Sequence, residues 1–238
     1  MFRPRSTFRT LTTLVAFCLA SAALTTGCAT LPIALEDTND HLVPIEVALE
    51  PDAALDNRAD TGKSHIALVR HFVRGRDLHH VSAVIANVMA TARLENLSLR
   101  ATGYRTGTWN GITGTAMTIE PSQDLRRLEE RIVETLRMFV EDPETAEDFI
   151  VTTDGAWMRG QVIDSVVRFV PDFSGANYRP HAMVSSMPPD VAKRLETQAF
   201  EPFTFRATTV TVYQLDQAGV AQRALWTWTP GEPGARRP

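Results

Sequence analysis

The sequence predicts an α+β fold with mainly antiparallel sheet. Segments whose apolar residues repeat at helical spacing are interleaved with short segments of alternating or β-branched apolar residues. The sequence has no series of long, uniformly apolar strands of the kind that parallel βαβ units require. A content of 44% hydrophobic and 22% charged residues belongs to a globular chain rather than to a disordered or fibrous one.

The predicted elements follow one another along the body of the chain. An apolar strand over 65–73 precedes a helix over 77–92 that Asp77 can cap. Two strands then flank a turn rich in Gly, Thr and Asn, and Ser122 opens an amphipathic helix that extends to residue 139. The other predicted strands are 97–104 and 112–119 around that turn, then 149–153, 178–186, 203–215 and 220–228, and the other helices are 161–170 and 189–198.

The two ends of the chain are expected to lie outside this fold. Residues 1–27 resemble an export signal, in which arginines precede an apolar segment that is short for a membrane span. Residues 28–62 are rich in Asp, Asn, Glu and Pro and predict a tether, with at most a short edge strand at 43–49. Residues 229–238 predict a disordered tail, which leaves 63–228 as the folded domain.

The end of the export signal carries a second indication. The sequence Leu24-Thr-Thr-Gly-Cys28 resembles the bacterial lipoprotein signal, in which the Cys is lipidated and becomes the mature N-terminus. Cys18 would be removed with the signal, so Cys28 would be the one Cys left and no internal disulfide is expected. Acyl chains such as palmitate on Cys28 would anchor the protein to a membrane of the bacterial cell envelope, on its periplasmic or extracellular face. A plain export signal or an N-terminal anchor helix is the alternative.

The charge balance argues against broad nucleic-acid binding. The whole chain carries −4, but without Arg3, Arg5 and Arg9 of the export signal the remainder has 21 basic against 28 acidic residues, or −7. Such an acidic body does not attract a nucleic-acid backbone without regard to sequence, although it is compatible with a small local basic site.

Several common chemistries lack their sequence context. The sequence Gly62-Lys-Ser64 lacks the first Gly of a phosphate-binding P-loop and precedes a predicted strand instead of a helix. His65 and His71 share a strand face but would lie roughly 20 Å apart, too far to bind one ion. We therefore expect no metal and no cofactor.

Two histidines in matching apolar frames are the best candidates for catalysis. They occur in Ser64-His65-Ile-Ala-Leu and Pro180-His181-Ala-Met-Val, about half a mature chain apart. In each frame the His and the residue two positions later share one strand face, and the apolar residues between them face the other side.

These frames resemble the two signature motifs of the 2H phosphoesterase superfamily, in its 2′-5′ RNA ligase-like and cyclic phosphodiesterase branch. The resemblance spans about residues 63–228. It includes Asn177-Tyr-Arg-Pro-His181 and Phe169-Val-Pro-Asp-Phe-Ser-Gly175 before the second motif, and Phe203-Thr-Phe and Val212-Tyr-Gln-Leu215 after it. It implies a bilobal α+β structure whose lobes each contribute a His-bearing strand to a central cleft.

The resemblance also implies a chemistry. In this family one imidazole takes a proton from water or a ribose hydroxyl while the other protonates the leaving oxygen, which suits a group with an ordinary pKa near 6.5. No metal is needed. The ligand would be a phosphate-containing small molecule or an oligonucleotide, and His65 and His181 would be the acid and the base.

This chain departs from the family pattern at both hydroxyl positions. Ala67 and Met183 stand where the family has Thr or Ser, whose hydroxyls donate hydrogen bonds to the phosphate oxygens. Loss of one such donor costs on the order of 10²–10³ in rate. Arg70, Tyr104 and Arg179 lie near the motifs in the sequence and are candidates for substrate-binding donors.

Two functional hypotheses therefore stay open. The first is a lipid-anchored phosphodiesterase that acts on a cyclic phosphate or a 2′-5′ linkage. The second is a non-catalytic envelope lipoprotein, a pseudoenzyme that binds a ligand or a partner protein in the same cleft.

Labelled palmitate tests the proposed lipidation. We expect the protein expressed in a bacterial host to incorporate the label, and Cys28→Ala to lose it, because the thiol that carries the acyl chain is gone. Cys18→Ala is the matched control and should be labelled like the wild type. Equal labelling of the wild type and Cys28→Ala would contradict lipidation at Cys28.

Overall fold

The computed structural model describes residues 41–56, 64–109, 112–143, 150–186 and 189–230. No helix in these ranges is long and apolar enough to cross a membrane. Cys18, Cys28 and the predicted signal lie outside the described residues, as do the first part of the predicted tether and nearly all of the predicted tail.

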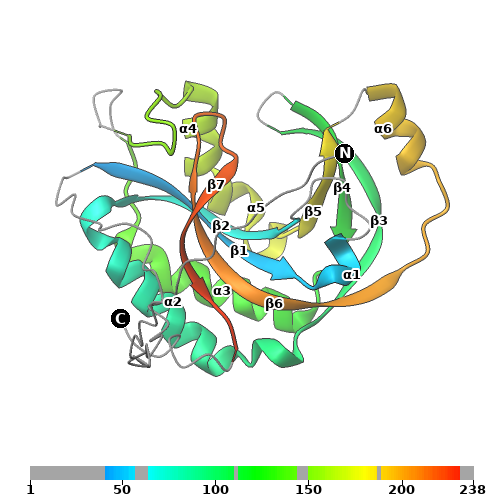
Figure 1. The fold of residues 1–238 in the computed structure, drawn as a ribbon, viewed down its shortest axis with the longest axis horizontal. Helices are drawn as coiled ribbons and strands as arrows, with labels where there is room; N and C mark the ends of the chain where they lie inside the picture. Colours follow the sequence, from blue (N-terminus) through cyan, green and yellow to red (C-terminus); the bar gives the residue numbers. More distant parts are fainter. Residues whose placement is uncertain (1–40, 57–63, 110–111, 144–149, 187–188, 231–238) are drawn as a thin grey trace, which may run out of the picture. The chain divides into compact units, whose positions relative to one another are not determined.

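Seven strands form one sheet in which the named strands all pair antiparallel. The order is β1-β2-β5-β4-β3-β6-β7, with a further pairing of β1 to β6 (Figure 1). The strands are β1 (Leu42–Pro51), β2 (Ile66–Arg74), β3 (Ser98–Trp109), β4 (Ile112–Ile119), β5 (His181–Ser186), β6 (Phe203–Leu215) and β7 (Ala221–Trp228). The predicted α+β fold with mainly antiparallel sheet is confirmed.

The long strand β6 joins two groups of strands. Its first residues, 203–206, pair with β3, and residues 207–214 pair with β1. One group is β1, β2, β6 and β7, and the other is β3, β4 and β5. The two groups meet a second time at β2 and β5, where the recorded Cα pair is Ile66 with Ala182. Each group thus contributes one of the two histidines, His65 immediately before β2 and His181 at the start of β5, and a central cleft between the groups stays a prediction.

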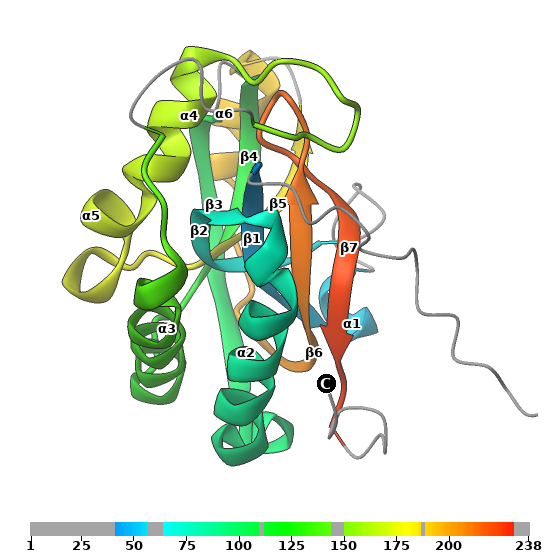
Figure 2. The ribbon, with the colours of Figure 1, turned by 90° about the vertical axis from the view of Figure 1, so that its left-hand side faces the viewer.

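Helices pack on both faces of the sheet. On one face, α2 (Leu78–Ala92) and α3 (Gln123–Leu136) lie side by side (Figure 2), and their apolar stripes enter the main core. Ser122 caps α3 as expected, since its hydroxyl accepts a hydrogen bond from the Leu125 amide at 3.3 Å. The remaining helices are α1 (Ala53–Asp56), α4 (Gly160–Val167), α5 (Phe169–Phe173) and α6 (Pro189–Glu196).

A second, smaller core supports the other face. It joins α4 to the ends of β1, β2 and β6 through Leu42, Phe72, Val162, Val166 and Leu215. The single helix predicted over 161–170 is therefore two short helices, α4 and α5. The strand predicted over 149–153 is not formed by its described residues, which contribute an isolated bridge from Ile150 to Leu42.

The predicted tether is wrong over residues 42–56. Strand β1 pairs with β2 on one side and with β6 on the other, so it is an internal strand and not an edge strand. Ile45, Val47 and Leu49 are fully buried in the main core. Pro44 is accommodated because the pairing with β6 begins one residue later, at Ile45. The folded domain therefore begins near residue 42 and not at residue 63.

Truncation tests this boundary. A chain beginning at residue 41 should unfold cooperatively, with the far-ultraviolet circular dichroism expected of the described helices and strands. A chain beginning at residue 64 should be unfolded or insoluble, because it loses the internal strand β1 with its buried side chains and leaves β2 and β6 without their shared partner. Cooperative unfolding of the shorter chain would contradict the assignment of β1 to the core.

Candidate functional site

The pairing of β2 with β5 brings the two sequence motifs together. Ile66 and Ala182 are directly opposite and fully buried, so they point into the core. In an antiparallel pair the residues on either side of them face the opposite surface. His65 is then opposite Met183 and Ala67 opposite His181, and all four share one face of the sheet. The two histidines lie on a diagonal of this arrangement, for which Cβ atoms are typically about 7–8 Å apart.

Two side-chain hydrogen bonds fasten this junction. The Ser64 hydroxyl donates to the carbonyl oxygen of Met183 at 3.1 Å, and the buried Tyr178 hydroxyl donates to the carbonyl oxygen of Ala67 at 3.2 Å. Each bond reaches from one motif to the other across more than a hundred residues of sequence. They stabilise the register that places the histidines.

The ring of His181 is oriented by the backbone. Its Nδ1 lies 3.0 Å from the carbonyl oxygen of Arg179. A carbonyl oxygen only accepts, so Nδ1 carries the proton, and in the neutral ring Nε2 holds the lone pair. Burial lowers the pKa of His181 below 6.5, and the positive charges of Arg105 and Arg70 lower it further. His181 is therefore a neutral imidazole with a basic Nε2 near neutral pH.

The ring of His65 is held by a buried carboxylate. Nε2 of His65 lies 2.7 Å from Oε1 of Glu46, a β1 residue with no exposed surface. Arg70 binds the same carboxylate, with Nε and Nη2 at 2.6 and 2.5 Å from Oε2. The guanidinium also lies over the ring of Phe169, 5.8 Å from its centroid.

These contacts shift the pKa of both partners. Burial alone would raise the pKa of Glu46, but Arg70 and His65 outweigh it and hold the pKa at about 2. Burial alone would lower the pKa of His65, but the Glu46 carboxylate outweighs it and raises the pKa above 6.5. The pKa shifts of His65 and His181 thus have opposite signs, which is the pattern expected of an acid and base pair.

The strand β6 completes the surroundings of His65. The rings of His65 and Tyr213 have centroids 5.5 Å apart, and the Tyr213 hydroxyl donates to the Glu50 carboxylate. Tyr213 is directly opposite Glu46 across β1 and β6. His65 is therefore enclosed by groups from β1 and β6 as well as by its own strand.

The predicted substrate-binding residues have three different outcomes. Arg70 lies on the same face as the histidines but is engaged by Glu46. Arg179 donates to the carbonyl oxygens of Ala176 and Tyr178 at 2.9 and 3.1 Å, so it is bound to its own loop.

Tyr104 does not join the site. It pairs with the fully buried Met117 and therefore lies on the core face of the sheet, where its ring contacts Phe200 edge-on at 4.9 Å. Ala67 and Met183 lie between the histidines and add no hydrogen-bond donor there.

Sequence reasoning missed Glu46, which is the group that sets the state of His65. The sequence feature that could have identified Glu46 is its position as the single charged residue at the centre of the alternating segment 43–49. That segment lies within the predicted tether. A carboxylate in an otherwise apolar strand requires buried partners, because an isolated buried charge is costly. Arg70 and His65 are those partners.

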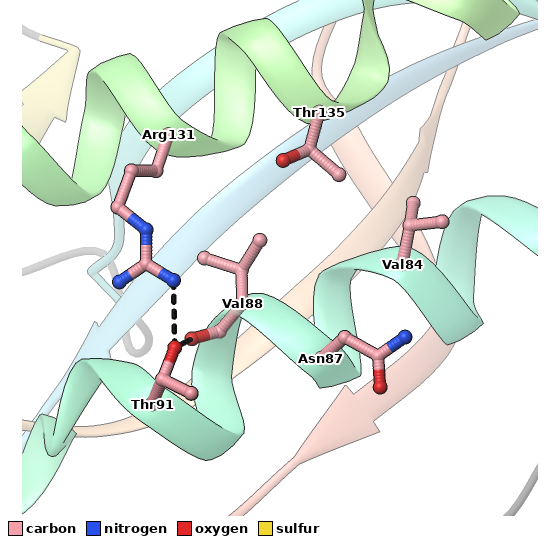
Figure 3. Close-up of a pocket in the computed structure, with 6 residues that line it drawn as sticks. All are labelled: Val84, Asn87, Val88, Thr91, Arg131 and Thr135. Atoms are coloured by element: carbon pink, nitrogen blue, oxygen red, sulfur yellow. Dashed lines mark hydrogen bonds between the residues drawn. The ribbon is translucent and has the colours of Figure 1, made fainter.

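The structure also contains a shallow cavity away from the histidines. It has a volume of about 320 Å³ and lies between α2 and α3, where Arg131 donates to the Thr91 hydroxyl at 2.6 Å (Figure 3). It lies on the helical side of the molecule and not on the face that carries His65 and His181. In the described ranges no group of three or more His, Cys, Asp or Glu side chains is arranged to hold a metal ion.

Comparison with known proteins gives a distant structural similarity. No protein-family model and no curated protein matches the sequence. Nine chains of solved structures match, among them the crystal structure of E. coli LigT complexed with 3′-AMP. That similarity has 11% sequence identity and a TM-score of 0.38, and it covers 79% of this chain and 97% of LigT. No functional argument rests on a likeness this distant, so the function is argued from the site.

Removing the buried carboxylate tests the role of Glu46. We expect Glu46→Gln to lower the free energy of unfolding by about 3–5 kcal/mol, because Arg70 and His65 lose their counter-charge. The exposed Glu95→Gln is the matched control and should change it little. Urea unfolding of the three proteins at about pH 6 is the measurement, and equal midpoints for Glu46→Gln and the wild type would contradict the role.

The pH dependence of stability gives a second test. The raised pKa of His65 means that its contribution is complete below pH 6.5 and is lost as the pH rises through the folded-state pKa. The difference in unfolding free energy between the wild type and His65→Gln should therefore shrink between about pH 6 and pH 9. A difference that grows over this range would show that the folded-state pKa is not raised.

Proposed function

We propose that the protein is a metal-independent phosphodiesterase that hydrolyses a cyclic phosphate or a 2′-5′ linkage. The observation that carries the proposal is the pairing of Ile66 with Ala182, which aligns His65 and His181 on one face with opposite pKa shifts. Two imidazoles on one face of the sheet, with pKa values shifted in opposite directions, provide the acid and the base that hydrolysis of a phosphate ester requires.

His181 is the base in this proposal. Its Nδ1–H is fixed by the Arg179 carbonyl, so Nε2 is the nitrogen that accepts a proton. Nε2 takes a proton from a water molecule as the water oxygen forms a bond to phosphorus. The fixed ring orientation reduces the entropic cost of aligning water and phosphate.

His65 is the acid. It remains an imidazolium to higher pH than an ordinary histidine because it forms an ion pair with Glu46, whose Oε1 lies 2.7 Å from Nε2. The Nδ1 proton is then the one that passes to the leaving ribose oxygen as the bond between phosphorus and that oxygen breaks. The products are a phosphate monoester and a free hydroxyl, and exchange with solvent restores the two protonation states.

The alternative is a pseudoenzyme that binds a ligand or partner in the same place. The observation that favours it is that Ala67 and Met183 both lack the hydroxyl that the family uses to bind phosphate oxygens. The two proposals are distinguished by the wild type's activity. An inactive wild type that gains activity through Ala67→Thr with Met183→Thr would support the pseudoenzyme.

We also propose that the site operates at the bacterial cell envelope, with the domain anchored through acyl chains on Cys28. The proposal rests on the sequence around Cys28. It favours a small phosphate-containing substrate over cytoplasmic RNA.

Substitution of each histidine tests the catalytic assignment. We expect the wild type to hydrolyse 2′,3′-cyclic nucleotides or 2′-5′-linked oligonucleotides, and His65→Ala and His181→Ala each to lower kcat/KM by about 10²–10⁴, the contribution of a positioned acid or base. The exposed His79 of α2 provides the control variant His79→Ala, which should retain activity. Activity that survives in either site variant would rule out that residue as the acid or base.

The pH profile assigns the two roles. Activity should rise as His181 loses its proton below pH 6.5 and fall as His65 loses its proton above pH 6.5, which gives a broad bell. Glu46→Gln should move the falling limb to lower pH, because the carboxylate that raises the pKa of His65 is gone. If activity falls at the same pH in Glu46→Gln as in the wild type, Glu46 does not control the pKa of the catalytic acid.

A further inference from the structure

Strand pairing extends the face that carries the histidines onto β3 and β4. Met183 is directly opposite Ala116 of β4, and Ala116 is directly opposite Arg105 of β3. Opposed residues of antiparallel strands share a face. Arg105, Ala116, Met183 and His65 therefore form one row across four strands, on the side away from the main core.

A second row runs parallel to the first. His181 is directly opposite Thr118 of β4, and Thr118 is directly opposite Gly103 of β3. Gly103, Thr118, His181 and Ala67 share the same face as the first row. The fully buried Met117 between Ala116 and Thr118 confirms the alternation, because it faces the core.

The residues in these rows bring two donors to the histidines. Directly opposed residues have Cβ atoms about 5 Å apart, so the side chains of Thr118 and His181 are neighbours. Arg105 lies two strands from Met183, roughly 10 Å across the sheet, and the residue between them is an alanine. An extended arginine side chain is long enough to cover most of that distance. In agreement with this placement, Arg105 is one of the charges that lower the pKa of His181.

The surface beside Thr118 is open. A Cβ atom added at Gly103 would meet nothing within 4 Å. Gly103 also has no positive φ, so its backbone would accept a side chain without strain. The position next to Thr118 therefore accepts at least the first atom of a side chain and can be changed by substitution.

We propose that Arg105 and Thr118 bind the phosphate oxygens of the ligand in place of the hydroxyls that the motif positions Ala67 and Met183 lack. The inference deepens the proposed function and rests on it for the position of the phosphate between the two histidines. Arg105 lies on the face that carries His181, and its charge lowers the pKa of that histidine, so it contributes positive charge on the His181 side. Thr118 contributes a neutral donor, as a motif hydroxyl would.

This arrangement explains how an acidic protein can bind an anion. The chain carries −4 overall, but Glu46 is offset by Arg70 and by protonated His65, and Arg105 adds a further positive charge. The ligand class is a phosphate ester bearing a sugar or similar group, and the open surface at Gly103 would lie beside the esterified group.

Binding to the full-length protein, measured by isothermal titration calorimetry, tests the inference without turnover. The probes are 3′-AMP and inorganic phosphate. We expect Arg105→Gln to weaken 3′-AMP binding at least tenfold and Thr118→Val to weaken it severalfold. Arg105→Lys should restore part of the loss because it keeps the charge. Arg100→Gln, which removes an exposed β3 arginine paired with Glu120, is the control and should bind like the wild type.

Gly103→Leu supplies a second test that removes no donor. Its side chain should fill the open surface and weaken 3′-AMP binding, while leaving inorganic phosphate less affected because phosphate has no esterified group. Thermal unfolding near the wild-type temperature would show that each variant folds.

The outcomes separate this inference from the proposed function. If the wild type shows no hydrolysis but binds 3′-AMP through Arg105 and Thr118, the inference holds for the pseudoenzyme and the phosphodiesterase proposal falls. If the wild type hydrolyses its substrate but Arg105→Gln and Thr118→Val bind and turn over like it, the inference is overturned and the histidine assignment stands. No binding of 3′-AMP or phosphate by the wild type overturns the inference as well.

Discussion

A carboxylate with no exposed surface lies between a guanidinium and an imidazole, and the site depends on it. Glu46 is ionised because Arg70 and His65 are within hydrogen-bond distance, and His65 retains its proton because Glu46 is ionised. Neither charge would be stable alone at this depth. Glu46 in β1, Arg70 in β2 and His65 immediately before β2 thus determine one another's protonation state, and the position of the His65 ring follows from that network.

The backbone sets the other half of the site. The carbonyl oxygen of Arg179, in its own loop, fixes the tautomer of His181. Both imidazoles are half-buried, and they differ in pKa because His65 forms an ion pair with a carboxylate while the charges of Arg105 and Arg70 act on His181. The difference is a property of their surroundings, since the two sequence motifs are alike.

The sequence predicted the parts of this site that depend on local pattern. The strands carrying His65 and His181, the face they share with Ala67 and Met183, and the cap of α3 at Ser122 all follow from spacing within a few residues. The parts that depend on register between distant strands were not predictable. Tyr104 was chosen by proximity in the sequence, but the pairing of β3 with β4 places Arg105 on the site face and Tyr104 on the core face.

Strand β1 is a second element whose position could not be predicted from local sequence. A segment with Pro44 and Glu46, in a stretch rich in Asp, Asn, Glu and Pro, has the composition of an exposed linker. It is internal because β6, more than 150 residues later, supplies a second edge, and because Arg70 and His65 neutralise its one buried charge. Composition reports the average solvent preference of a segment and contains no information about a partner so far along the chain.

The pairing of β6 with both β1 and β3 also determines when the sheet can form during translation. Strand β1 is among the first parts of the domain to leave the ribosome, and β6 is near the last, yet β1 obtains one of its two neighbours from β6. β3 pairs with β6 in the same way. The sheet cannot close, and the site cannot assemble, until the C-terminal strands are available, so the nascent chain stays incomplete for most of translation. The domain therefore folds after its C-terminal strands have been made, whatever the order in which its helices form.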